Sequence, residues 1–218
     1  MTQINTNLYS LNAQRNLAKN SLGLASAVER LSSGLRVNSA RDDASGLSTG
    51  MVIDAQARQT AAEIRAQANI ISANQIGDGA LSVVGDIVTR IIELTSQGGG
   101  TTEIGLLVAQ AATIQTEATA KGGTYTGLTV TSVATTTDLQ TIATNRATAG
   151  ANMNNAQFSI QAKQVSYENQ LARKSRIMDA DFAVETSNLS RFQVLQQAGT
   201  AMIAQANAIP QNVLALLR

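Results

Sequence analysis

Apolar residues recur every three or four positions along most of this chain, which is the spacing of one face of an α-helix. Near the N-terminus two such stripes run side by side, and one of them repeats at strict sevens through Leu17, Leu24 and Leu31. Two adjoining stripes form a wide apolar face that requires more than one partner helix. The other stripe, which Arg15 interrupts, comprises Ile4, Leu8, Leu11, Ala18, Leu22 and Ala25.

The C-terminal segment repeats this design. One of its stripes, at strict sevens, comprises Leu195, Met202, Ile209 and Leu216. The other comprises Leu189, Phe192, Gly199, Ile203, Ala206, Val213 and Leu217. Because both ends of the chain carry a double stripe of similar length, we predict that residues 1–33 and 184–218 form an outer pair of antiparallel helices.

The interior of the chain predicts three further helices, over about 44–97, 102–120 and 137–177. A helix of about 50 residues would be ~75 Å long, which exceeds normal globular helices and indicates a coiled coil or a fibrous assembly. Residues 124–134 are rich in Thr, Val and Tyr and predict one small β-hairpin. The expected fold class is therefore mostly α, with long antiparallel coiled-coil helices that form a folded-back hairpin and one small β-hairpin near the middle.

The terminal helices need partners beyond each other. An isolated pair buries only one stripe of each helix, and that burial contributes less free energy than the ordering of the backbone costs. We therefore predict that the termini are largely disordered in the monomer and become ordered on assembly. A closed four-helix bundle is the alternative, since apolar stripes usually mark a core.

Composition excludes several classes of function. The 16 basic and 15 acidic residues of this 218-residue chain give a net charge of +1 and form no basic cluster, which argues against nucleic-acid binding. The sequence has no Cys and no His, so disulfides, the usual metal ligands and the commonest general base are absent, and no enzyme activity and no cofactor are expected.

No apolar run is long enough to span a membrane. The N-terminus also lacks the basic and apolar regions of a cleaved signal peptide. A membrane-active amphipathic protein is a second class to weigh, but it would carry Lys and Arg along its polar face, where this chain has mostly Asn, Gln, Ser and Thr.

Both ends of the chain resemble bacterial flagellin. The matching stretches are residues 22–36 (LGLASAVERLSSGLR), residues 42–47 (DDASGL) and residues 195–218 (LQQAGTAMIAQANAIPQNVLALLR). The resemblance covers nearly all of residues 1–97 and 139–218. A hook–filament junction protein of the same family is the alternative, although its C-terminus would not normally read PQNVLALLR.

The resemblance implies a structural subunit of the extracellular flagellar filament that self-assembles through its terminal helices. Residues 1–33 and 184–218 would form the inner-core domain, 34–46 and 178–183 the connecting spoke, and 47–177 the outer helical domain. The variable outer domains of the family would be missing. The expected core and polymerisation residues are Leu8, Leu11, Leu22, Leu31, Leu189, Phe192, Leu195, Met202, Ile209 and Leu216.

The resemblance also implies several partners. Export through the flagellum-specific type III apparatus would need no cleaved signal peptide, and the filament cap and hook-junction proteins would meet the assembled polymer. A flagellar secretion chaperone would hold the apolar C-terminal stripe before export. The expected chaperone-binding residues are Leu195, Met202, Ile209 and Leu216.

In many flagellins the stretch that matches Arg90, Glu93 and Leu94 lies in the surface seen by the vertebrate Toll-like flagellin receptor. This chain departs from that pattern, because Ile92 replaces a usual basic residue and an acidic residue is absent near Gln110. An ordinary contact within the polymer is the alternative role for Arg90.

The densest acidic pair, Asp42 and Asp43, lies in the expected spoke beside Arg41, with Arg36 nearby. Two adjacent carboxylates without His are a poor metal site. We interpret all four residues as spoke-junction residues that cap a helix start and pair charges there.

Overall fold

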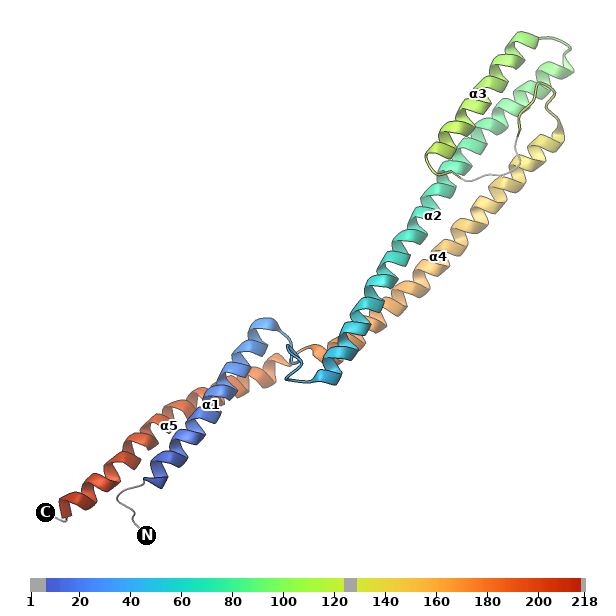
Figure 1. Cartoon of the computed structure of the whole chain (residues 1–218). Helices are drawn as coiled ribbons and strands as arrows, with labels where there is room; N and C mark the ends of the chain where they lie inside the picture. The colour runs from blue at the N-terminus through green and yellow to red at the C-terminus, as the bar shows by residue number, and fades with distance from the viewer. Residues whose placement is uncertain (1–6, 124–128, 217–218) are drawn as a thin grey trace. The chain divides into compact units, whose positions relative to one another are not determined.

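The computed structural model describes residues 7–123 and 129–216, with side chains described as far as residue 208 (Figure 1). In this part of the chain there are five helices and no strand, so the expectation of a mostly helical protein is confirmed. The helices are α1 (Leu8–Ser33), α2 (Ala44–Ser96), α3 (Thr101–Ala120), α4 (Thr136–Met178) and α5 (Phe182–Leu216).

The chain divides into two compact units. We call residues 1–55 with 170–218 the terminal unit, and residues 56–169 the central unit. In the terminal unit, Asn7 bonds the carbonyl oxygen of Ala206 whereas Arg30 pairs with Glu185, so α1 and α5 run antiparallel. In the central unit α2 and α4 are held by two ion pairs in the same antiparallel sense. These pairs are Glu63 with Lys163 and Asp78 with Arg146. The predicted folded-back pairing of helices is confirmed.

Short polar side chains set the ends of the terminal-unit helices. Asn7 precedes α1, and its Oδ1 accepts a hydrogen bond from the backbone N–H of Ser10 (3.1 Å). The helix ends at Gly34, whose φ of 71° lies in the left-handed region. Residues that carry a Cβ atom rarely adopt this conformation, so glycine suits the position. Asp43 caps α2 by accepting a bond from the N–H of Gly46 (2.8 Å).

The small β-hairpin expected over residues 124–134 is not seen. Residues 129–134 form no strand, and 124–128 lie outside the described residues. Two apolar residues of the described part pack against helices: Ala134 is buried in the core of the central unit, and Val130 packs against that core, whereas Val133 is exposed. In residues 129–134, packing of Val130 and Ala134 against helices takes the place of the strand pairing that the pattern rich in Thr and Val predicted.

Three helices close the core of the central unit. Leu81, Val84, Val88 and Ile91 of α2 are almost fully buried. The partners that cover them include Ile104 and Ala111 of α3 and Ile142 of α4. Each aliphatic side chain of this size contributes about 1.5–3 kcal/mol when it leaves water, so this cluster is the main source of stability in the central unit.

Candidate interaction surface

In the terminal unit, α1 and α5 pack along one apolar stripe of each helix. The stripe of α1 at strict sevens is half-buried at Leu17, Leu24 and Leu31, with Ala27 fully buried beside it. On α5 the covered side chains belong to the stripe with spacings of three and four. They include Leu189, Phe192, Ile203 and Ala206.

Two glycines let large side chains interlock across this pair. A Cβ atom on Gly23 would lie 2.6 Å from the ring of Phe192, which no real contact allows. A Cβ atom on Gly199 would lie 3.2 Å from a methyl group of Leu17. Each glycine therefore forms the hole for a side chain of the partner helix, as in a coiled coil.

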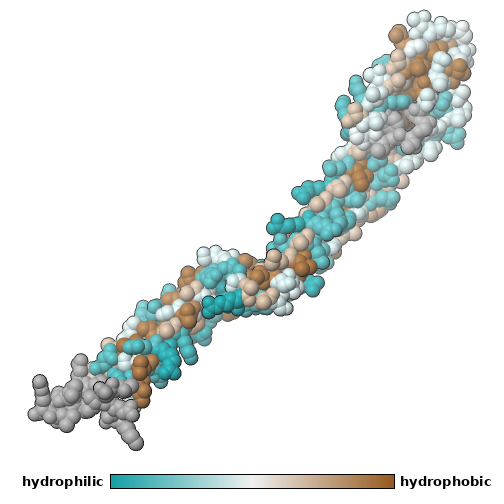
Figure 2. All heavy atoms as spheres, in the orientation of Figure 1, coloured by the Kyte–Doolittle hydropathy of each residue, from teal (hydrophilic) through white to brown (hydrophobic). Residues whose placement is uncertain are grey.

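The second stripe of each helix stays exposed. On α1 it includes Leu8, Leu11 and Leu22, and on α5 it includes Leu195 and Met202. Hydrophobic residues accordingly reach the surface of the α1–α5 pair in Figure 2. Ile4 lies outside the described residues, as do the side chains of Ile209 and Leu216. Proteins that function as monomers rarely expose apolar stripes such as these, so the second stripes of α1 and α5 indicate a binding partner.

A groove of about 420 Å³ runs between α1 and α5. Its α1 wall includes Tyr9, Asn12 and Asn16, and its α5 wall includes Leu195 and Met202. None of its lining residues carries a charge. The exposed stripe Leu8, Leu11 and Leu22 does not line the groove. The pair therefore presents two separate surfaces, the uncharged groove and the apolar outer stripe of α1, which the exposed Arg15 interrupts between Leu11 and Leu22.

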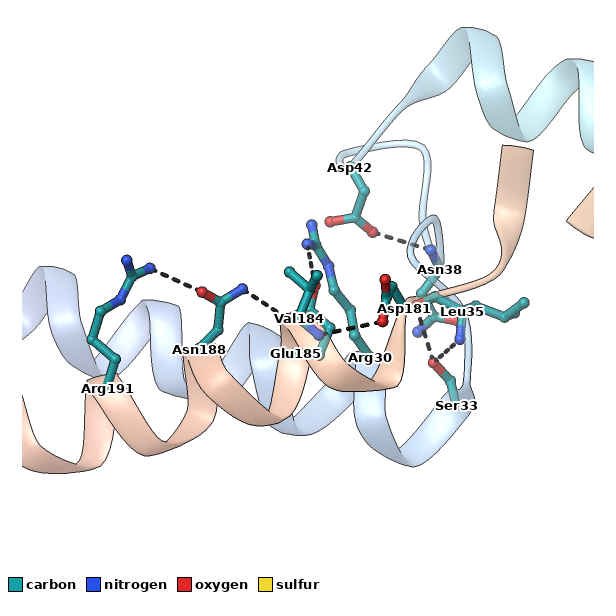
Figure 3. A network of polar contacts seen from close by, with 10 residues as sticks. All are labelled: Arg30, Ser33, Leu35, Asn38, Asp42, Asp181, Val184, Glu185, Asn188 and Arg191. Carbon is teal, nitrogen blue, oxygen red and sulfur yellow. Dashed lines mark hydrogen bonds and ion pairs between the residues drawn. The ribbon is translucent and has the colours of Figure 1, made fainter. Parts of the chain in front are cut away.

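A polar network holds α1 against α5 at one end of the pair (Figure 3). Arg30 reaches across to Glu185 with an N–O distance of 3.1 Å, and only 9% of the Glu185 side chain is exposed. Asn188 donates to the same carboxylate, and Arg191 donates to Asn188 (3.0 Å). The pair Arg30–Glu185 was not among the residues singled out from the sequence, because periodicity does not show which charges meet across 155 positions.

At the expected spoke junction, hydrogen bonds join the loop after α1 to the end of α4. The N–H groups of Arg36 and Val37 donate to the carbonyl oxygen of Met178 (2.7 and 3.4 Å). The N–H of Ala180 donates to the carbonyl oxygen of Gly34 (2.9 Å). In addition, the guanidinium group of Arg36 donates to the carbonyl oxygen of Ile177. These bonds tie the loop after α1 to the end of α4.

Asp42 folds the same loop. One carboxylate oxygen accepts from the hydroxyl and the N–H of Ser39 (both 2.9 Å) and from the N–H of Asn38 (3.3 Å). The Ser39 hydroxyl bond, followed by the Ser39 backbone bond, lowers the pKa of Asp42. Among the other expected junction residues, Asp43 caps α2 and Arg41 is exposed. The described residues contain no cluster of potential metal ligands.

Arg90 lies between two carboxylates on the surface of the central unit. Its guanidinium is 3.3 Å from Glu93 and 3.3 Å from Glu103 of α3. These two partners, Glu93 first, raise the pKa of Arg90. Leu94, the third residue of the expected receptor surface, is buried in the core of the central unit.

Comparison with known families accounts for nearly the whole chain. The profile of the bacterial flagellin N-terminal helical region matches residues 4–120, and that of the bacterial flagellin C-terminal helical region matches residues 133–217. This chain belongs to the bacterial flagellins. The resemblance seen in its terminal residues is thus confirmed, and flagellin is a structural filament protein and not an enzyme.

The chain is also similar along its full length to individual flagellins. It is 31% identical to a flagellin of Halalkalibacterium halodurans and 30% identical to a flagellin of Xenorhabdus nematophila, with 99% of both chains covered in each case. It is 29% identical to the flagellar filament 31.3 kDa core protein of Treponema maltophilum, again over 99% of both chains. These relatives favour a filament subunit over a hook–filament junction protein.

This flagellin is a short form. The two family profiles leave only residues 121–132 between them. The alignment with the Halalkalibacterium flagellin is 270 positions long and that with the Xenorhabdus flagellin 309, against the 218 residues of this chain. Both relatives therefore carry segments that this chain lacks. None of the described helices is apolar and long enough to cross a membrane.

Proposed function

We propose that this flagellin polymerises through two surfaces of its α1–α5 pair, the uncharged groove and the apolar outer stripe of α1. The outer stripe of α1 in one subunit covers the groove of the next, so that Leu8, Leu11 and Leu22 of one copy meet Leu195 and Met202 of another. Contact between two different surfaces is heterologous, and it generates an open helical polymer when the rotation between neighbours does not close a ring.

The observation that carries this proposal is the exposed second stripe. Once α1 and α5 have packed, Leu8, Leu11, Leu22 and Met202 remain open to water. A closed four-helix bundle would have covered these side chains within one chain. A second copy of the subunit supplies the missing apolar partner, in keeping with the polymerisation of the family.

The domain division follows as part of the same proposal. Residues 1–33 and 184–218 form the inner-core layer, 34–46 and 178–183 the spoke, and 47–177 the outer layer of the filament. The backbone bonds at Met178 and Ala180 support the spoke, because they tie the loop after α1 to the end of α4 and to the segment before α5. In the free subunit α1 and α5 pair through one stripe only, and the termini gain the rest of their order when neighbouring subunits cover them.

The C-terminal stripe is also the proposed chaperone site. Leu195 and Met202 are exposed in the free subunit, where an uncovered apolar stripe would promote aggregation before export. A chaperone groove that holds these two residues, together with Ile209 and Leu216, would prevent premature polymerisation. The filament cap and hook-junction proteins would meet the same surfaces at the ends of the polymer.

A receptor contact is a further part of the proposal, and it concerns the central unit. Arg90 and Glu93 are exposed and would provide the polar contacts of a Toll-like receptor, while Leu94 supports the helix from within the core. An Arg90→Ala subunit would lose activity in a receptor reporter assay if this surface is used. Unchanged activity would leave Arg90 as a contact within the polymer.

Assembly of point variants tests the main proposal. Leu22 and Leu106 are equally exposed leucines (66% and 69%), on α1 and α3 respectively. We expect Leu22→Asn to abolish filaments in negative-stain electron microscopy, whereas Leu106→Asn should still form them. A chain without residues 184–218 should remain monomeric. Normal filaments from Leu22→Asn would refute the proposed interface.

A further inference from the structure

The methionines of this chain differ sharply in exposure. The sequence has five Met and no Cys or Trp, so thioethers are its main targets for two-electron oxidants. Met178 is 8% exposed, whereas Met51 and Met202 are 65% and 62% exposed. An oxidant in solution can therefore reach Met51 and Met202 in the free subunit, while Met178 is shielded.

Met202 differs from Met51 in its surroundings. It lines the uncharged groove between α1 and α5, next to Leu195, on the exposed stripe of α5. Met51 lies on α2 and does not line this groove. Of the two exposed thioethers, only that of Met202 belongs to the surface that the proposed polymer contact covers.

We infer that Met202 is an oxidation site through which peroxide blocks polymerisation of the free subunit; this inference rests on the proposed function. The thioether sulfur attacks one oxygen of hydrogen peroxide, the S–O bond forms and the O–O bond breaks. The departing hydroxide takes the proton of the hydroxyl group now bound to sulfur and leaves as water. Sulfur is oxidised by two electrons to the sulfoxide and the peroxide is reduced by two.

The sulfoxide changes the interface and leaves the subunit folded. In the free subunit the new S=O group faces water, so α5 keeps its packing on α1. In the polymer the same group must give up its water and pack against the leucines of a neighbouring stripe, and moving so polar a group out of water against apolar side chains is costly. Polymer formation also removes Met202 from solvent, so a subunit that has already assembled is protected from the oxidant.

The experiment uses the unmodified full chain and a partial dose of hydrogen peroxide. The treated subunits are assembled and sedimented, and peptide mass spectrometry measures sulfoxide at each methionine in pellet and supernatant. We expect Met202 sulfoxide to be enriched in the supernatant by about tenfold or more, which corresponds to about 1.4 kcal/mol or more. Met51 sulfoxide should divide evenly between the fractions, as an internal control within each sample.

Two further arms make the test decisive. The assembly yield of a Met202→Leu chain should be insensitive to peroxide when compared with that of the same untreated variant, and sulfoxide reductases with a thiol reductant should restore assembly of the oxidised unmodified chain. Equal sulfoxide at Met202 in pellet and supernatant would overturn the inference, as would equal peroxide sensitivity of Met202→Leu. Failure of the untreated chain to assemble would refute the proposed function itself, so the two failures are distinguishable.

Discussion

The central unit and the α1–α5 pair are both built from apolar stripes with spacings of three and four, yet the central unit buries its stripes and the α1–α5 pair leaves one stripe of each helix exposed. In the central unit, α3 packs against α2, and Val84 and Ile91 lose all contact with water. In the α1–α5 pair the outer stripe of α1, Leu22 among it, stays exposed. The width of an apolar stripe thus specifies how many partners a helix needs, and chain connectivity decides whether these come from the same molecule.

The largest effect expected from this comparison is a contrast between two truncations. Ile91→Ala removes a fully buried side chain and should lower the stability of the free subunit by about 2–5 kcal/mol. Leu22→Ala removes an exposed side chain and should change it by less than about 0.5 kcal/mol, while preventing assembly. Thermal and urea unfolding of both variants checks this. If Leu22→Ala lowered the stability of the free subunit as much as Ile91→Ala does, the outer stripe of α1 would have to be buried within the free subunit.

A second contrast concerns charges. Glu185→Ala leaves the partly buried Arg30 guanidinium without its carboxylate, and its Nε already lacks a partner. We expect a loss of about 1–3 kcal/mol in the stability of the α1–α5 pair. Glu93→Ala removes an exposed partner of Arg90 and should cost about 0–1 kcal/mol. Amide hydrogen exchange along α1 and α2 measures both, and equal protection losses would contradict the contrast.

A third prediction addresses the interlocking glycine of the pair. Gly23→Ala forces the Phe192 ring to move and should destabilise α1–α5 packing by about 1–3 kcal/mol. A Phe192→Leu change in the same chain should restore part of the loss. Gly150→Ala in α4, where a Cβ atom meets nothing within 4 Å, should instead stabilise its helix by about 0.5–1 kcal/mol. Limited proteolysis of the free subunits would detect the difference.

The smallest expected effect is a pH dependence at the junction. Because the pKa of Asp42 is lowered in the folded chain, its bonds to Ser39 and Asn38 contribute fully above the ordinary pKa of 3.8. This contribution is lost as the pH falls through the lower, folded value. Ser39→Ala should bring the Asp42 pKa back towards 3.8 in an NMR titration. An unchanged titration would show that Ser39 does not hold the carboxylate.

The sequence predicts the helices well and the contacts between them less well. The expected helices over 102–120 and 137–177 match α3 (Thr101–Ala120) and α4 (Thr136–Met178), because local spacing and glycine breaks determine helix ends. The double stripes also predict that one apolar stripe of each terminal helix stays open, although not which one. The predicted hairpin over 124–134 is not seen, because Val130 and Ala134 pack on helices that lie elsewhere in the sequence.

The missed site residues share one property. Arg30 meets Glu185, and Gly23 receives Phe192, only after α1 and α5 have adopted one register. A single helix pattern does not show that register, because several registers would cover a stripe equally well. The exposed stripes need no such information, because spacing along a single helix is enough to define them.

The most direct test of the account is thiol accessibility at the outer stripe of α1. The chain has no cysteine, so Leu22→Cys and Leu106→Cys each introduce one reactive group. A maleimide reagent should label both positions rapidly in free subunits. In filaments we expect labelling of Leu22→Cys to be strongly slowed while that of Leu106→Cys continues. Filaments in which Leu22→Cys reacts as fast as in the free subunit would contradict polymerisation through this stripe.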